Sequence, residues 1–188
     1  MEYTPIIMFP AYIENPVNVS FEGQDAGEKI LLLLRAHPIT NLKWIITALL
    51  LMLVPFFIPA ALSLVNFDSL QFPPSFAIVF LLINYLLVLT IIFEGFLFWY
   101  FNVYIVTDKN IIDVDFHSIL FKNIDVAPLR NIEDTSSSMG GILNSLFHFG
   151  NVFIQTAGTS RNIDFIDVPR PHAVADFILD EAHKRYGS

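Results

Sequence analysis

The chain has 188 residues, of which 54% are hydrophobic and only 15% are charged, and it contains no cysteine. This composition is too apolar for an ordinary soluble domain of this size and predicts a membrane protein. The lack of cysteine excludes disulfides, thiolate zinc sites and cysteine nucleophiles in this chain. The net charge of -8 at pH 7 repels polyphosphates, so we expect no nucleic acid partner.

The segment before the first apolar block divides into two parts. Residues 1–27 contain three prolines and two glycines without a clear hydrophobic period, so we expect a loosely ordered arm. Residues 28–43 combine a run of leucines with flanking basic residues. Two interpretations of this second part are open: a short juxtamembrane element at the membrane surface, or an apolar strand or helix that completes the core of a cytoplasmic domain.

Two apolar blocks follow and predict a helical hairpin. Residues 44–65 and residues 76–98 are each long enough, at about 1.5 Å rise per residue, to cross about 30 Å of hydrocarbon. Residues 66–75 are short, polar and proline-bearing, as expected for an external loop. Pro55 and Pro59 each remove a backbone donor from the first helix, and we expect a kink there.

The basic residues predict the orientation of this hairpin. None of them lies between the two blocks, whereas Lys29, Arg35 and Lys43 precede the first block and Lys109 follows the second. Loops rich in lysine and arginine stay in the cytoplasm. We therefore expect a protein of the cell membrane with two spans and with both termini in the cytoplasm.

Two polar residues of the second block are candidates for a helix–helix or partner contact. Asn84 lies near the middle of the block, where its amide is placed to bond a helix of the same hairpin or of a neighbouring copy. Glu94 ends the uncharged run, and an ionisable group in lipid often marks a partner contact or a polar pathway. Because Trp99 and Tyr100 follow closely, the alternative is that Glu94 reaches the cytoplasmic head-group layer.

After the second block the hydrophobic period changes from helical to β. In YIVTDKNIIDVDF, residues 104–116, apolar residues alternate with aspartates on one side of the turn TDKN, which predicts a hairpin. A further strand is expected within residues 119–129. A second hairpin is expected from NVFIQT and RNIDFIDV, joined by the turn at residues 157–160.

A helix is predicted at the carboxy terminus. Pro169 and Pro171 end the β region and open a segment with an apolar stripe and a charged opposite face. The stripe consists of Val174, Phe177, Ile178 and Ala182. Because the strands need a cover, we expect a small curved sheet or split barrel capped by this helix.

The order of these segments resembles a known family. Two apolar helices followed by YIVTDKNII, IDVAPLRNIED, FHFGNVFIQTAG and IDFIDVPRPHAVADFI are similar to bacterial membrane proteins that bear a pleckstrin-homology-like domain, over residues 28–186. The resemblance implies a mainly-β split barrel of two packed antiparallel sheets with about seven short strands and a carboxy-terminal helix, here residues 99–188. One departure is HFG at residues 148–150, where the family has a GFG-like turn.

The resemblance does not bring a phosphoinositide ligand. Related domains that bind phosphoinositides place several basic residues around the first hairpin loop. Here that loop offers Lys109 beside Asp108, and the next strand carries Asp113 and Asp115. We therefore expect no phosphoinositide to bind.

Catalytic constellations are also missing from the sequence. The five histidines are far apart and form no HExxH pattern, and no GxSxG elbow, P-loop or GxGxxG turn is present. We expect no catalytic residues, no metal, no cofactor and no enzymatic activity.

The segment MGGILNSLFHFG is a candidate docking loop, because an apolar cluster stands in a region that otherwise reads as loop. The alternative is a plug that closes one end of the β core. The cluster consists of Ile142, Leu143, Leu146, Phe147 and Phe149.

Taken together, these features predict a membrane-anchored binding or scaffolding module whose cytoplasmic domain contacts other membrane or cytoplasmic proteins, with the ligand open and a homo-oligomer as an option. The alternative is a subunit of a membrane transport or export assembly that works through the helical hairpin. That alternative would require Asn84 or Glu94, since two helices alone cannot enclose a conduit.

Overall fold

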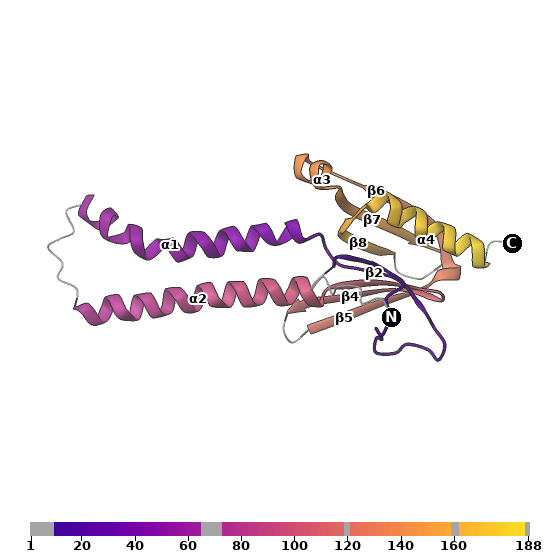
Figure 1. Cartoon of the computed structure of the whole chain (residues 1–188), viewed down its shortest axis with the longest axis horizontal. Helices are drawn as coiled ribbons and strands as arrows, with labels where there is room; N and C mark the ends of the chain where they lie inside the picture. Colours follow the sequence, from indigo (N-terminus) through magenta and orange to yellow (C-terminus); the bar gives the residue numbers. More distant parts are fainter. Residues whose placement is uncertain (1–9, 65–72, 119–120, 159–161, 187–188) are drawn as a thin grey trace, which may run out of the picture. The chain divides into compact units, whose positions relative to one another are not determined.

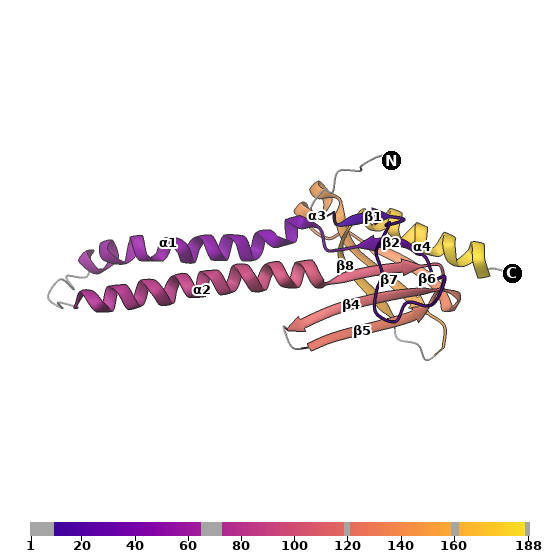
Figure 2. The same ribbon diagram turned by 60° about the horizontal axis from the view of Figure 1, so that its bottom comes forward.

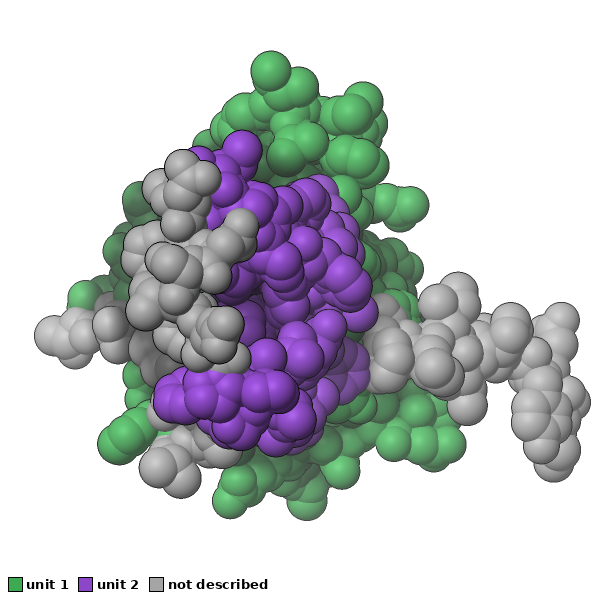
Figure 3. Space-filling model, turned by 90° about the vertical axis from the view of Figure 1, so that its left-hand side faces the viewer, with its two compact units in different colours: residues 1–40, 98–188 green, residues 41–97 purple. Residues whose placement is uncertain are grey.

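The structure, a computed structural model, describes residues 10–64, 73–118, 121–158 and 162–186. The chain divides into two compact units, which Figure 3 colours separately. Residues 1–40 and 98–188 form a β-rich domain, and residues 41–97 form a pair of long helices. Most of the predicted external loop, residues 66–75, lies outside the described residues.

The helical unit consists of α1, Leu42–Leu64, and α2, Pro74–Phe101, the last turn of which belongs to the β-rich domain. A short 3-10 turn, Pro38–Asn41, precedes α1. α2 is longer than predicted because proline is tolerated in a first helical turn and the aromatic cluster FLFWYF continues the helix. α1 runs through Pro55 and Pro59 and bends along its course in Figure 1, as expected from two missing backbone donors.

The two helices approach each other closely at one glycine. A Cβ added to Gly95 of α2 would lie 2.6 Å from Cγ of Trp44 on α1, so the indole packs directly on the glycine backbone. Any larger residue at position 95 would force the tryptophan aside. The indole nitrogen of Trp44 also donates a hydrogen bond to Oδ1 of Asn41 at 3.0 Å, which fixes the ring orientation.

Two antiparallel sheets build the β-rich domain (Figures 1 and 2). The first has the strand order β1-β2-β3-β4-β5, with β1 Tyr12–Glu14, β2 Ile30–Leu34, β3 Val103–Thr107, β4 Asn110–Ser118 and β5 Phe121–Pro128. The second has the order β6-β7-β8, with β6 Ile132–Ser138, β7 Phe149–Thr156 and β8 Ile163–Pro169. A 3-10 turn, Leu129–Asn131, links the sheets, α3 spans Ile142–Phe147, and α4 spans Pro171–Tyr186 and packs on β6 and β7.

These elements confirm the predicted hairpins and the predicted final helix. β3 and β4 pair around the turn TDKN, with Val106 opposite Ile111. β7 and β8 pair as the second hairpin, although part of its turn lies outside the described residues. The strand β6 was not predicted, because its sequence IEDTSSS has no apolar alternation, and it forms by pairing with β7.

The predicted domain boundary at residue 99 is wrong. β2 comes before both helices in the sequence but pairs antiparallel with β3, which comes after them, and Leu34 lies opposite Tyr104. Within the segment 28–43, the leucine run Ile30–Leu34 is therefore a core strand, whereas Pro38–Asn41 form a 3-10 turn and α1 begins at Leu42. The leucine run is buried on both faces because its side chains alternate between two cores: Leu32 and Leu34 pack in the core shared with the second sheet, and Leu33 packs under the amino-terminal arm.

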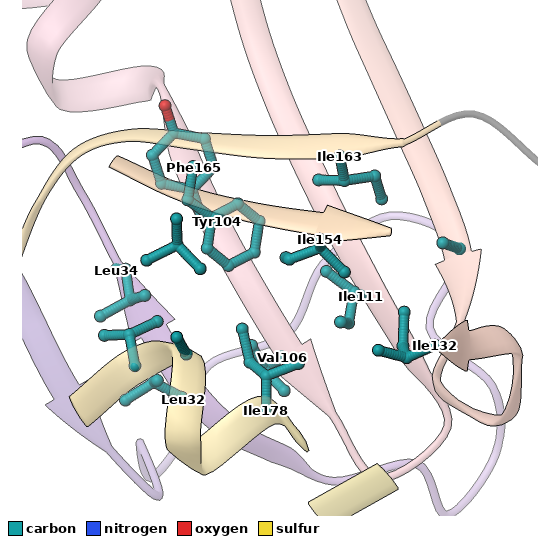
Figure 4. Close-up of a cluster of buried hydrophobic side chains, with 14 of the residues drawn as sticks. Leu32, Leu34, Tyr104, Val106, Ile111, Ile132, Ile154, Ile163, Phe165 and Ile178 are labelled. Carbon is teal, nitrogen blue, oxygen red and sulfur yellow. The ribbon is translucent and has the colours of Figure 1, made fainter. Parts of the chain in front are cut away.

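The main core lies between the two sheets and α4 (Figure 4). Leu32, Leu34 and Val106 from the first sheet meet Ile154 and Phe165 from the second, and all five are fully buried. The aromatic rings of Tyr104 and Phe165 stack at 4.5 Å between centroids. The predicted stripe of α4 closes this core through Val174, Ile178 and Ala182, with Phe177 partly buried at its margin.

A second, smaller core corrects the prediction of a loosely ordered arm over residues 1–27. On the outer face of the first sheet, Leu33, Ile105 and Ile112 are buried together, and Ile13 and Phe21 from the arm pack against them. The arm thus contributes β1 and covers part of this sheet face through Ile13 and Phe21. Residues 1–9 lie outside the described part of the chain.

Candidate functional site

The two polar residues singled out in the second apolar block lie in different surroundings. Asn84 is buried in the helical unit, and its Oδ1 atom has no hydrogen-bond partner among the described residues. Glu94 is exposed on α2. The two side chains therefore do not form a joint polar site. The burial of Asn84 is consistent with a role between helices, while its unpaired oxygen marks a weak point in that packing.

The predicted docking loop forms a short helix whose apolar side chains face solvent. Ile142, Leu143, Leu146 and Phe147 of α3 are between 42% and 87% exposed. Phe149 is instead buried at the start of β7, so the structure separates it from the other four. The alternative of a core plug is wrong for α3 and holds only for Phe149. We call the four exposed residues the α3 apolar patch.

A buried carboxylate, that of Glu28, stabilises the first hairpin loop through hydrogen bonds. Glu28 is only 5% exposed and accepts hydrogen bonds from the hydroxyl of Thr107 and from Nδ2 of Asn110. In the same loop, Nζ of Lys109 forms an ion pair with Oδ2 of Asp25 at 3.2 Å. The only lysine of this loop thus already faces acidic residues of the amino-terminal arm.

A pocket opens at another edge of the β-rich domain. It has a volume of about 620 Å³. Its lining combines the start of β1, the residues after β2, the end of α3 and the junction between β8 and α4. The polar side chains of the lining are Tyr12, His37, His148 and Arg170, and the others are Pro10, Ala11, Pro38, Phe147 and Pro169.

Two corners of the chain border this pocket in a left-handed backbone conformation. His148 has a φ of 53° and ends α3, and Arg170 has a φ of 52° and precedes α4. The backbone N–H of Arg170 donates to the carbonyl of His148 at 2.9 Å, so the corners support each other. Left-handed backbone favours glycine or asparagine, and residues with long side chains there are uncommon. The sequence thus places a histidine and an arginine in left-handed backbone beside the pocket, and the arginine is the less usual of the two.

The His37 ring is fixed on one side of the pocket. It stacks on Phe149 with 5.1 Å between centroids, and its Nδ1 accepts a hydrogen bond from the backbone N–H of Ile39 at 3.2 Å. The His37 backbone N–H donates to the carbonyl of Asp167 at 2.7 Å. Burial lowers the pKa of the His37 imidazole, and the nearby charge of Asp167 opposes this effect.

We expect acid to weaken the β-rich domain through His37. Its pKa is lower in the folded state than in the unfolded state, so protonation favours unfolding. This contribution to stability is complete above the unfolded pKa of about 6.5 and is lost as pH falls from there through the lower folded value. Thermal unfolding at pH 7.5 and pH 5.5 (about one unit either side of that value) measures it.

The matched comparison uses two histidine variants. His37→Gln removes the titrating group and is expected to reduce the loss of melting temperature on acidification. His183→Gln, at an exposed position on α4, is expected to leave that loss unchanged. An equal acid effect in wild type and His37→Gln would contradict the assignment.

Sequence reasoning missed this pocket. Tyr12 lies in the segment expected to be loosely ordered, and His37 lies in a segment with two open interpretations. His148 drew notice only because HFG replaces the GFG-like turn of the related proteins. Arg170 drew none, because it lies between the two prolines that mark the end of the β region. These residues come together because the start of β1 lies near the ends of β2 and β8, which no local pattern indicates.

Comparison with known families places this chain beside bacterial proteins. A family model described as Bacterial PH domain matches residues 30–182. The match begins at the first residue of β2, so it contains both helices and the strands on either side of them. Comparisons with curated proteins and with solved structures gave no match.

Proposed function

The chain belongs to the bacterial PH domain family, and from this premise we propose that it is a membrane-anchored binding module. Its two helices span the cell membrane, and its β-rich domain stands in the cytoplasm together with both termini. The domain contacts membrane or cytoplasmic proteins and performs no catalysis. The single observation that carries the proposal is the pair of apolar helices inserted between β2 and β3 of the domain.

The exposure of the helices supports the anchor. Both are long and apolar enough to cross a membrane. Only 6% and 11% of their most apolar windows are buried within the chain, whereas the core helix of a soluble protein would be mostly buried. Side chains so exposed to water would be costly, and a bilayer removes that cost.

The points at which the chain leaves the domain and returns to it support an anchor inserted into the domain. Arg35, at the end of β2, donates through Nε to the carbonyl of Tyr100 at 3.0 Å. The indole nitrogen of Trp99 donates to the carbonyl of Ala36 at 2.8 Å. The chain that enters the helices and the chain that leaves them are therefore bonded to each other inside the domain. An anchored domain of this kind does not need lipid affinity to stay at the membrane.

The first hairpin loop supports a ligand other than a phosphoinositide. Lys109 is paired with Asp25. The Asp108 carboxylate accepts a hydrogen bond from the backbone N–H of Lys29, and the Glu28 carboxylate accepts one from Nδ2 of Asn110. A phosphate approaching this loop would meet carboxylates together with a single engaged lysine. We therefore propose that binding uses another surface of the domain.

Alkaline extraction of membranes from cells that produce the chain tests the anchor. We expect the full-length protein to stay in the membrane pellet. A version in which a short linker replaces residues 41–97 is expected to move to the soluble fraction. Protease added to inside-out vesicles should cleave the domain, while protease added to intact spheroplasts should not. Release of the full-length protein by alkali would contradict the proposal.

Crosslinking in native membranes separates the binding module from a transport or export subunit. If the domain binds partners, Leu34→Ala in its core should remove them and Asn84→Leu in α2 should not. If the helical hairpin carries the function, Asn84→Leu or Glu94→Gln should remove the partners while the domain stays folded. The observation that favours this second candidate, a transport or export subunit, is the unpaired oxygen of Asn84.

A further inference from the structure

The pocket at the ends of β1, β2 and β8 lies beside the α3 apolar patch. Phe147 belongs to both, since it is the last residue of α3 and lines the pocket. One edge of the domain therefore offers a cationic, partly polar cavity and four exposed apolar side chains. Arg170 brings a positive charge to the cavity, and none of the described residues that line it is acidic, although the Asp167 carboxylate lies close enough to act on His37.

Arg170 is available for a ligand. Its guanidinium lies over the ring of Tyr12 at 5.8 Å from the centroid, an arrangement that fixes an arginine without using its hydrogen-bond donors. In the described part of the chain this guanidinium takes part in no ion pair. Arginine presents a planar set of donors that matches the oxygens of a phosphate. Glu14, the nearest acid on β1, is engaged with the hydroxyl of Tyr12.

We propose that this pocket binds the phosphate of an anionic phospholipid head group while the α3 apolar patch enters the head-group layer beside it. The inference rests on the proposed function, because it takes the domain to be held next to a bilayer. His37 is separated from the first residue of α1 by four residues, a length that reaches at most about 18 Å when fully extended. The covalent connection therefore limits how far the pocket residue His37 can lie from the start of α1.

Charge favours one bound head group over a general attraction to the membrane. The whole chain carries a net charge of -8, so an anionic leaflet repels most of the domain. Binding must then come from a local site with a cation and an apolar contact. The α3 patch supplies the apolar part, in the manner of short amphipathic elements that lie in the interface. The patch favours a lipid over a soluble phosphate ester, because a soluble ester would leave these four apolar side chains in water.

The backbone at Arg170 offers a sharp test. Arg170→Asn removes the charge and suits the left-handed conformation at least as well as arginine does, so the fold should be unharmed. Arg130→Asn, at an exposed position in the turn Leu129–Asn131, removes an equal charge away from the pocket. For the apolar patch, Leu146→Ser is matched by Ile124→Ser, at an exposed position on β5.

The experiment is native mass spectrometry of the full-length protein in a non-ionic detergent, titrated with phosphatidylglycerol or with phosphatidylcholine. Because apolar helices also retain lipids, the result is the difference between variants. We expect Arg170→Asn to weaken phosphatidylglycerol binding by about tenfold, the loss of one charge-assisted hydrogen-bonding group. Leu146→Ser should weaken it by a smaller factor, and both control variants should match the wild type within about twofold.

Three results would overturn the inference. The first is equal phosphatidylglycerol affinity in Arg170→Asn and Arg130→Asn. The second is equal binding of phosphatidylcholine and phosphatidylglycerol by the wild type. The third is displacement of the lipid by inorganic phosphate at concentrations similar to those of the lipid, which would assign the pocket to a soluble phosphate ester.

The experiments distinguish a wrong assignment of the pocket from a wrong assignment of the membrane anchor. If alkali leaves the protein in the membrane but Arg170→Asn binds lipid normally, only the pocket assignment falls. If alkali releases the protein while the Arg170-dependent preference for phosphatidylglycerol persists, the anchor falls and the pocket stands.

Discussion

A chain limited to residues 99–188 is expected not to fold. This segment lacks β2, whose Leu32 and Leu34 are fully buried and whose Ile30 and Leu33 are nearly so. Burial of one such side chain stabilises by about 1.5–3 kcal/mol, so the four together supply about 6–12 kcal/mol. Because a whole domain is stable by only about 5–15 kcal/mol, their loss removes most or all of the stability. The edge of β3 would also be left open to aggregation.

The joined chain provides the control. In this variant a flexible linker of about ten residues replaces residues 41–97, so that it joins residues 10–40 to residues 98–188. The hydrogen bond between Trp99 and Ala36 places the two ends close together, so this linker can replace the helices without strain. We expect the joined chain to be soluble and to unfold cooperatively, as judged by circular dichroism and by dispersed amide resonances. Cooperative unfolding of residues 99–188 alone would contradict the assignment of β2 to the domain.

Leu34→Ala is expected to lower the free energy of unfolding of the β-rich domain by about 2–5 kcal/mol, because it leaves a cavity in a core with little room to collapse. Leu34 is fully buried between the sheets, opposite Tyr104 on β3. The measurement is a urea titration of the full-length protein in detergent, with protease cleavage of the unfolded domain as the readout.

The control for Leu34→Ala is the same change at Leu146. This leucine is 65% exposed on α3, so its truncation should change the free energy of unfolding by no more than about 0.5 kcal/mol. A shift at Leu34 no larger than the shift at Leu146 would show that β2 is not a core strand.

Local patterns carried the prediction of most elements. The long uncharged apolar runs form the helices α1 and α2, and each run carries its own signal within one continuous segment. The β hairpins at TDKN and before Pro169 follow from alternation and turn residues a few positions apart. The stripe of α4 follows from helical periodicity over one continuous segment. In each case the residues that determine the structure are neighbours in the sequence, and so the signal is local.

The candidate docking loop shows where local patterns stop. Its apolar residues were grouped because they are adjacent in sequence, yet Phe149 is buried while Ile142 is the most exposed of the five. The difference arises because α3 ends at the left-handed corner of His148, after which the chain enters β7. A reversal at a residue other than glycine has no strong sequence signature.

By itself, the sequence determined the two apolar helices, the hairpins, the terminal helix and the membership in a family whose domain is built from them, because each depends on residues close together in the chain. Only the tertiary structure decided that β1 and β2 belong to the domain, that Leu32 and Leu34 face one core while Leu33 faces the other, and that Tyr12, His37, His148 and Arg170 share one pocket. The physical reason is that strand pairing across an inserted helical hairpin, and the meeting of strand ends that follows from it, are contacts between distant segments, and no periodicity within either segment specifies them.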